Sequence, residues 1–379
     1  MTRTRAAAHL LSFVSAAALV SAGAVPASAG IFGKKKEPPP APVVVAPPAP
    51  PPIALSDHVV QAASAYRAYM RKAASISAKW ADGQSIEQAL AYTAQSEPQQ
   101  LARGAVAYAA LIALQDPAFV AGVRNYAVDA GTRTEIARRL VANPDYAAQL
   151  PGAATAAALI ISSMNADGAR VAGTGFIVKQ SAYDIQHTKW SLGFVPDRDG
   201  RLARAKLAAA STMAPEQTEV AELRLAVPGA DPAGGAHIAP VSAVGPATPP
   251  YAPTVARGLA VAALAALGMA GDDNDAQVQA VMNDPAGSAC LNMAKLNLYQ
   301  CLAVAKPYYE DVFCLGQHIL IDTGQCISKG VGGMPPSTPL VPANLPAPVI
   351  ATPAALAIPS PTGNVVGPPT ATVAASRTP

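Results

Sequence analysis

The sequence predicts an all-α protein: an Ala-rich helical bundle plus a small disulfide-stapled helical domain, with Pro-rich disordered linkers and tail. Two observations lead to this fold class. Stretches rich in alanine, the residue with the highest helix propensity, alternate with prolines that follow Asp or Asn, as is typical of helix starts. No stretch shows the regular alternation of polar and apolar residues that marks a half-buried strand.

The first 29 residues have the three parts of a secretory signal peptide. Arg3 and Arg5 give a positive start, an apolar run covers 10–25, and an Ala-Ser-Ala triplet at 27–29 supplies a cleavage site. The apolar run is too short and too rich in small residues for a membrane span. We therefore expect cleavage after Ala29 by the general Sec-type route, a periplasmic or secreted protein, and no transmembrane anchor after cleavage.

Removal of this segment changes the charge of the chain. It leaves 350 residues (379 − 29) and lowers the formal charge from +3 to +1, because two arginines leave without an acid. A chain this close to neutral lacks the excess positive charge with which proteins bind nucleic acid. We expect no nucleic-acid partner and instead an envelope protein or the cell wall.

Proline divides the rest of the chain. Of the 37 prolines, nine lie in 38–52, seven in 228–253 and twelve in 331–379, so these stretches are not expected to form packed helices. The predicted organisation is a signal peptide (1–29), a Lys/Pro-rich tether (30–53), a helical domain (54–227), a Pro-rich linker (228–252), a disulfide-stapled helical domain (253–330) and a disordered Pro/Ala-rich tail (331–379).

The helix boundaries follow from capping pairs. Asp-Pro or Asn-Pro pairs at 116–117, 143–144 and 284–285 each place a capping residue before a proline. The longest predicted helix contains three glycines, which lower helix propensity. The predicted helices are 57–80, 84–96, 98–115, 117–128, 132–142, 144–150, 153–189, 200–213, 215–226, 254–270, 275–283, 286–305 and 307–320.

The four cysteines, Cys290, Cys301, Cys314 and Cys326, all lie in one stretch. Cys290 and Cys301 are eleven residues apart, which places both on the same face of a helix at about 100° per residue. Pro307 then breaks this helix, so a second helix can fold back antiparallel to the first. Four cysteines allow three pairings, and the hairpin favours the nested one, Cys301 with Cys314 and Cys290 with Cys326.

A zinc site is the rival interpretation of these cysteines. Zinc ligands normally come in pairs close in sequence, whereas every gap here has at least ten intervening residues. In an exported protein structural disulfides are therefore favoured over a zinc site. Because Cys326 follows Gly324, we expect it to lie beyond the end of the second helix. In outline the segment resembles the coiled-coil-helix twin-cysteine hairpin, although gaps of ten, twelve and eleven residues differ from that family's fixed spacing.

Motifs that would specify catalysis, a cofactor or a metal are not recognisable in this sequence. Asp184 and His187 are three residues apart on a predicted helix, but two residues alone specify no chemistry. The sequence therefore favours a non-enzymatic envelope scaffold, adaptor or binding module. The alternative is a peptidoglycan-active envelope hydrolase with paired carboxylates, for which Glu87, Glu97, Asp184 and Glu310 are the candidates.

The fold separates these two hypotheses. A cleft in which two of the candidate carboxylates converge at about 5–10 Å would support a hydrolase. Acids dispersed over solvated faces, together with an apolar concave surface, would favour the non-enzymatic role.

Overall fold

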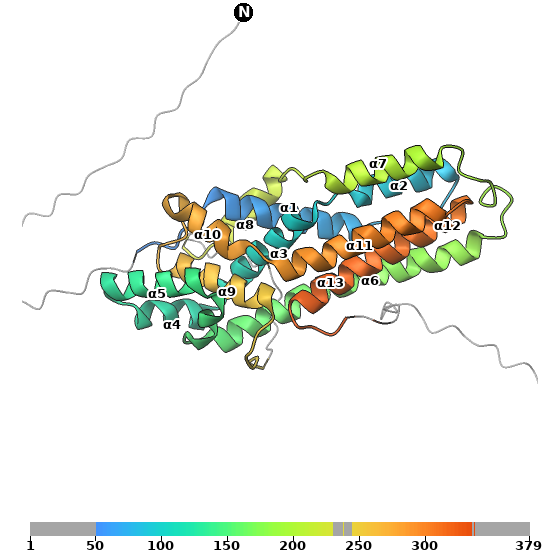
Figure 1. The fold of residues 1–379 in the computed structure, drawn as a ribbon. Helices are drawn as coiled ribbons and strands as arrows, with labels where there is room; N and C mark the ends of the chain where they lie inside the picture. The colour runs from blue at the N-terminus through green and yellow to red at the C-terminus, as the bar shows by residue number, and fades with distance from the viewer. Residues whose placement is uncertain (1–50, 230–237, 239–244, 336, 338–379) are drawn as a thin grey trace, which may run out of the picture. The chain divides into compact units, whose positions relative to one another are not determined.

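The computed structural model describes residues 51–229, 238, 245–335 and 337, all of which belong to one compact unit (Figure 1). The predicted all-α class is confirmed, since extended pairing within these ranges is limited to one isolated bridge between Phe194 and Pro307. The predicted signal peptide, most of the tether, much of the linker and most of the tail lie outside the described residues.

Most helices begin and end within a few residues of the predicted ranges. The first ends at Ala74 rather than at 80, and a further helix follows residue 320, where none was predicted. Two short 3-10 helices, η1 (Pro144–Gln149) and η2 (Asp272–Asn274), and one π-helix, η3 (Leu315–Ile321), complete the described elements. The α-helices are α1 (Asp57–Ala74), α2 (Gly83–Ala94), α3 (Pro98–Ala113), α4 (Pro117–Tyr126), α5 (Ala130–Ala142), α6 (Ala153–Ile185), α7 (Arg198–Ala210), α8 (Gln217–Leu225), α9 (Pro253–Ala266), α10 (Asp275–Met282), α11 (Pro285–Val304), α12 (Tyr308–Cys314) and α13 (Asp322–Gly330).

The predicted helix caps are confirmed. The side chain of Asp116 accepts hydrogen bonds from the backbone N–H groups of Ala118 and Phe119 at the start of α4. Asn143 and Asp284 cap η1 and α11 in the same way. These N–H groups have no partner within the helix, so the caps fix where each helix begins.

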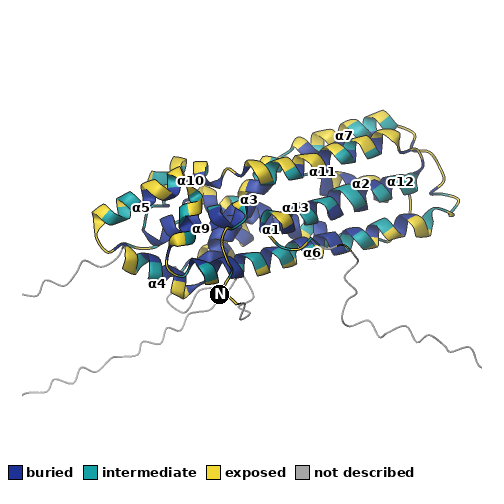
Figure 2. Ribbon diagram, turned by 60° about the horizontal axis from the view of Figure 1, so that its bottom comes forward, coloured by how far each residue is buried: buried dark blue, intermediate teal, exposed yellow. Residues whose placement is uncertain are grey.

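The core is centred on α3 and α9, two apolar helices that are buried over most of their length (Figure 2). Alanine is the most frequent residue in both helices, so the helix backbones must come close together for the interior to be filled. A Cβ atom on Gly258 of α9 would lie 2.5 Å from the Cβ atom of Ala109 in α3. A Cβ atom on Gly104 of α3 would lie 2.6 Å from the carbonyl oxygen of Ala62 in α1. Glycine at these two positions therefore permits the close packing.

The two segments predicted as separate helical domains share this core. Helix α9, in the 253–330 segment, packs on α3, in the 54–227 segment, and α13 packs along α6. One hydrophobic cluster contains residues of both segments. The predicted linker therefore does not separate two cores within the described residues. The physical reason is that alanine-rich helices bury little surface each, so α9 must be surrounded by helices from the other segment.

Helix α6 runs unbroken over Ala153–Ile185 in spite of its glycines. It packs antiparallel to the segment formed by α12, η3 and α13. A Cβ atom on Gly168 would lie 2.6 Å from the carbonyl oxygen of Gly324, and one on Gly175 would lie 2.7 Å from the backbone nitrogen of Ile321. The glycines of α6 thus mark the places where two helix backbones touch.

The π-helix η3 keeps this contact in register. Gly168 and Gly175 are seven residues apart in α6, whereas Gly316 and Gly324 on the facing segment are eight apart. A π-turn contains one residue more than an α-turn, so η3 absorbs the extra residue and both facing glycines touch α6. The helix continues through Gly324, which places Cys326 inside α13; the prediction that Cys326 lies beyond the helix end was wrong.

The end of the predicted tether belongs to the packed unit. The carbonyl oxygen of Pro51 accepts a hydrogen bond from the guanidinium group of Arg124, and Ile53 packs against the hydrophobic core. The packed part of the chain therefore includes residues before the predicted boundary at 54, because a carbonyl and an apolar side chain in 51–53 have partners there.

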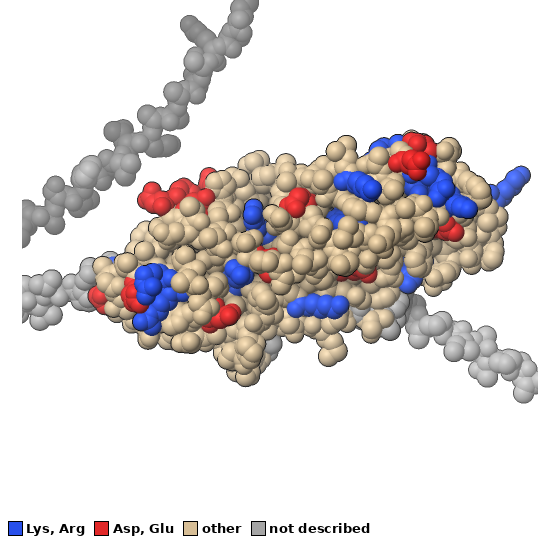
Figure 3. Space-filling view, in the orientation of Figure 1, with Lys and Arg blue, Asp and Glu red and all other residues tan. Residues whose placement is uncertain are grey.

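Charged residues are dispersed over the face that Figure 3 shows. Some of the small groups combine Lys or Arg with Asp or Glu and others carry one sign only, with uncharged surface between them. Within the described ranges, no single helix is both long and apolar enough to span a membrane. Helices α3 and α4 together have the length and composition for a span, but they meet at 86°.

Candidate functional site

Both disulfides join helices, in the nested pairing that the sequence favoured. Cys301 of α11 is bonded to Cys314 of α12, and Cys290 of α11 is bonded to Cys326 of α13. The Cα atoms are 5.7 Å apart in each pair, a separation that a disulfide bridges without backbone movement. The hairpin is thus fastened at two points, about 16 Å apart along α11. Two such bonds indicate an oxidising compartment, either extracellular or periplasmic.

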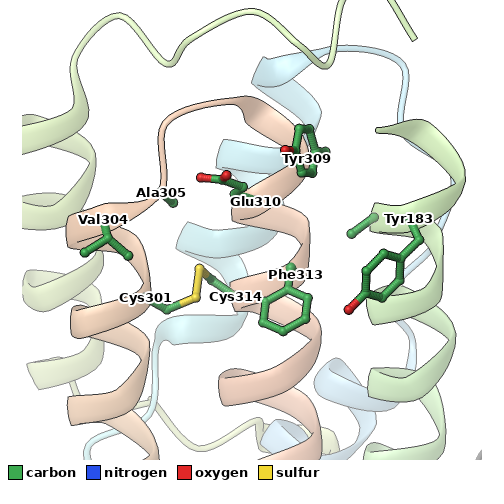
Figure 4. A pocket seen from close by; sticks show the side chains of 9 residues that line it. Tyr183, Cys301, Val304, Ala305, Tyr309, Glu310, Phe313 and Cys314 are labelled. Carbon is green, nitrogen blue, oxygen red and sulfur yellow. A yellow bond between two sulfur atoms is a disulfide. The ribbon is translucent and has the colours of Figure 1, made fainter. Parts of the chain in front are cut away.

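Beside the Cys301–Cys314 bond the surface has a recess of about 340 Å³, which we call the disulfide hollow (Figure 4). Its walls are mostly apolar, and Glu310 is the only acidic or basic residue that lines it. Its size and composition are those of pockets that bind small molecules. The lining residues come from α6, α11, α12 and the α11–α12 connection: Ala182, Tyr183, Cys301, Val304, Ala305, Tyr309, Glu310, Phe313 and Cys314.

The break between α11 and α12 positions the carboxylate of the hollow. A carboxylate oxygen of Glu310 accepts a hydrogen bond from the backbone N–H of Lys306 at 2.7 Å, which holds the side chain at the start of α12. The loop after α6 pairs with the same break. The N–H of Val195 donates to the carbonyl oxygen of Lys306 at 2.9 Å, and the N–H of Tyr308 donates to that of Gly193 at 3.2 Å. Both helix ends at the hollow are therefore fixed by backbone hydrogen bonds.

Aromatic rings form one side of the hollow, and the disulfide lies on the other (Figure 4). The rings of Tyr183 and Phe313 meet edge to face, with centroids 6.2 Å apart and an interplanar angle of 83°. The ammonium group of Lys179 lies 4.9 Å from the centroid of Phe313 and donates to the side-chain oxygen of Gln317 at 2.8 Å. Tyr183 is 46% exposed and Val304 is 73% exposed, so the rim of the hollow is open to solvent.

A buried ion pair fixes α12 against α7. Arg201 donates hydrogen bonds to the carboxylate of Asp311 and to the carbonyl oxygen of Leu302, and both charged side chains are buried. Arg198 donates to two further carbonyls at the end of α11. These carbonyls have no partner within their own helix, so the arginines complete its C-terminus. Burial raises the pKa of Asp311 to about 6, although the charge of Arg201 acts in the opposite direction.

A second buried charge lies on α11. Lys295 is 5% exposed, and its ammonium group donates to the carbonyl oxygen of Ala94, the last residue of α2, at 2.7 Å. A helix C-terminus attracts a cation, yet burial still lowers the pKa of Lys295 to about 7. The sequence prediction missed this residue. Its position four residues after Leu291 and three before Leu298 places it on the apolar face of the helix, and that spacing is the signal that identifies it.

The four carboxylates considered for a hydrolase are each held by a different neighbour. Asp184 and His187 are not hydrogen-bonded to each other, because Asp184 accepts from Gln180 instead. Only Glu310 of the four lines the disulfide hollow. The contacts are Glu87 with Arg204, Glu97 with the backbone N–H groups of Gln99 and Gln100, Asp184 with Gln180, and Glu310 with the backbone N–H of Lys306.

Neither a metal centre nor a known relative identifies the site. In the part of the chain that the structure describes, no three His, Cys, Asp or Glu side chains are grouped closely enough to hold a metal ion. Comparisons with family models, with curated proteins and with solved structures give no match. Function is therefore inferred from the chain's own geometry.

Proposed function

We propose that this protein is an exported, non-enzymatic component of the cell envelope, a binding module or scaffold that uses the disulfide hollow to hold a ligand or partner. The observation that carries the proposal is the composition of the hollow, an aromatic-lined apolar recess with a single carboxyl group. Binding favours a preformed cavity, because less ordering is then needed when the ligand arrives. The Cys301–Cys314 bond and the arginine-capped end of α11 provide such a cavity.

Export is supported by two independent features. Residues 1–29 have the sequence pattern of a Sec-type signal peptide with cleavage after Ala29, and all four cysteines are paired in disulfides. The mature chain begins at Gly30 in this proposal and is periplasmic or secreted. Its partner is an envelope protein or the cell wall.

The distribution of acids supports a role other than hydrolysis. Hydrolysis by paired carboxylates needs two acids on either side of one bond, and only Glu310 among the candidates lines the hollow. Asp311, the next acid along α12, is buried against Arg201 and is not a lining residue. A single carboxylate in an apolar recess suits recognition of a ligand better than general acid–base chemistry.

The export part of the proposal is tested on the full chain expressed in its native host. Cell fractionation should recover the protein outside the cytoplasm, and mass spectrometry should find Gly30 at the N-terminus. A matched variant with Ala27→Asp and Ala29→Asp should keep the longer N-terminus, because the small residues that the peptidase requires are gone. Recovery of uncleaved native protein in the cytoplasm would contradict export.

The binding part is tested with the purified mature protein. Incubation with peptidoglycan should release no soluble fragments, whereas a photocrosslinker placed at Val304, on the rim of the hollow, should capture an envelope component in intact cells. The same crosslinker at Leu207, an equally exposed residue of α7, serves as the control. Release of fragments that the Glu310→Gln variant no longer produces would overturn the non-enzymatic assignment.

A further inference from the structure

The disulfide hollow combines two features with which proteins hold organic cations. Three of its lining side chains are aromatic: Tyr183 on α6, and Tyr309 and Phe313 on α12. The face of an aromatic ring carries negative potential and attracts a cation, most strongly where water is excluded. Glu310 brings a carboxylate to the same recess, so charge and rings act in the same direction.

The carboxylate of Glu310 has room for a second partner. One of its oxygens accepts the backbone N–H of Lys306, and among the described residues it forms no ion pair. Figure 4 shows its carboxylate at the edge of the hollow, close to Ala305. Two nearby acids differ in this respect, because Glu87 is paired with Arg204 and Asp311 with Arg201. Glu310 therefore brings into the recess a negative charge that no side chain of the described protein pairs.

One cation of the chain already lies against one of these rings. The ammonium group of Lys179 lies 4.9 Å from the centroid of Phe313, although Lys179 is not a lining residue of the hollow. Its positive charge also opposes a second cation nearby, and the carboxylate of Glu310 offsets this repulsion. Cation binding in the hollow should for this reason depend strongly on Glu310.

Size and polarity define the rest of the ligand. A volume of about 340 Å³ holds a head group together with a ring or a short chain. The disulfide, Val304 and Ala305 offer only apolar surface, so they suit a hydrophobic body, and Glu310 disfavours an anion. We infer that the disulfide hollow binds a small organic cation, a quaternary ammonium head group carried on an apolar body. The inference rests on the proposed binding role and adds the class of ligand.

The test uses the purified mature chain with both disulfides formed and two isosteric probes. Choline is compared with 3,3-dimethylbutan-1-ol, in which carbon replaces the charged nitrogen, and benzyltrimethylammonium adds an apolar ring. NMR titration should shift the ring signals of Tyr183 and Phe313. We expect choline to bind about tenfold more tightly than the neutral probe, equivalent to about 1.4 kcal/mol, and benzyltrimethylammonium more tightly still.

Two variants separate the role of Glu310 from a general effect of charge. Glu310→Gln keeps an acceptor for the N–H of Lys306 and should lower the affinity for both cations about tenfold without affecting the neutral probe. Glu87→Gln, which removes an acid of α2 that does not line the hollow, should leave all three affinities unchanged. A thermal unfolding curve for each variant shows that it is folded.

Three results would overturn the inference: equal affinity for choline and its neutral isostere, an equal loss in the Glu310 and Glu87 variants, or no ring shifts at millimolar cation. Each of these leaves the position of the N-terminus and the cellular fraction untouched. Failure of the ligand assignment is therefore distinguishable from failure of the proposed export.

Discussion

The α3–α9 core and the disulfide-linked hairpin are built from similarly small residues, yet different interactions stabilise them. Helices α3 and α9 are buried over most of their length, and neither buries a charged side chain. Helix α11 buries a single stripe, which includes Lys295, and its partners contribute the buried pair of Arg201 and Asp311. Both disulfides lie in this second region.

The difference follows from how much apolar surface each region removes from water. Burial contributes roughly 25 cal/mol per Å², so a helix surrounded by neighbours gains stability even from alanine. A helix that buries one stripe of small residues gains much less. Both disulfides, Lys295 and the Arg201–Asp311 pair are found in the region with the smaller apolar burial. Variants in each region measure how much these interactions contribute to stability.

The largest effect is expected from Arg201→Met. It leaves the carboxylate of Asp311 buried without a partner and removes donors from the end of α11, which should lower the free energy of unfolding by about 3–5 kcal/mol. The matched control is Arg257→Met on α9, which removes a donor to the carbonyl of Val281 but breaks no ion pair. Urea unfolding measures both. Equal losses in the two variants would contradict the distinction between the regions.

Removal of the disulfides should have the next largest effect. Closing the Cys290–Cys326 loop contributes about 4 kcal/mol and closing the shorter Cys301–Cys314 loop about 3 kcal/mol, if the effect comes from the entropy of the unfolded chain. Serine replacing both cysteines of one pair tests each value. Hydrogen exchange should show lost protection in α11 and α13 with protection retained in α3. Uniform loss across all helices would show that the two regions unfold together.

Close backbone contacts are common to both regions, so their loss should have similar effects. Gly168→Ala places a methyl group 2.6 Å from the carbonyl oxygen of Gly324, and Gly258→Ala places one 2.5 Å from Ala109. Each should lower the free energy of unfolding by about 1–3 kcal/mol, even though alanine favours helix. Gly245→Ala is the control, because nothing lies within 4 Å of its Cβ position. A loss confined to one region, measured by urea unfolding, would restrict the packing argument to that region.

The smallest predicted effect, taken per pH unit, is the change in the free energy of unfolding that Lys295 causes. Its pKa is about 7 in the folded protein and near 10.4 in an unfolded chain, so between these values the unfolded state binds more protons. The free energy of unfolding of the native protein should therefore rise with pH, by up to about 1.4 kcal/mol per unit. Lys295→Met removes the charge that must be buried, so it should be more stable at pH 7 and lack this rise. Urea unfolding at pH 7, 8 and 9 compares the native protein with this variant. The same dependence of the unfolding free energy on pH in both proteins would contradict the lowered pKa of Lys295.

The features that the sequence predicted correctly are those set by local spacing. Asp116 before Pro117 specifies a helix start from two residues, and the eleven-residue spacing of Cys290 and Cys301 places both on one helix face. That shared face, with a break at Pro307, favoured the nested pairing that the structure contains.

The features that depend on contacts between distant segments were not predictable in this way. Gly324 has the sequence signature of a helix end, and only its contact with Gly168 explains why the helix continues. The Pro-rich linker indicated two domains. This prediction failed because amino-acid composition carries no information on how α9 packs against α3. The disulfide hollow brings Tyr183 of α6 beside α12, a contact between residues more than a hundred positions apart.

The π-helix η3 determines how this region tolerates changes in length. Deleting one residue between Gly316 and Gly324 would turn the segment into a regular α-helix, which is locally the more favourable form. The two facing glycines would then be seven residues apart, as Gly168 and Gly175 are on α6, so both backbone contacts would be kept. Converting η3 to an α-helix without the deletion would instead rotate everything beyond it by about 100° relative to α6, turning Gly324 away from Gly168 and Cys326 away from Cys290. The π-helix thus lets the segment carry one additional residue while the helical phase on which the outer disulfide depends is preserved.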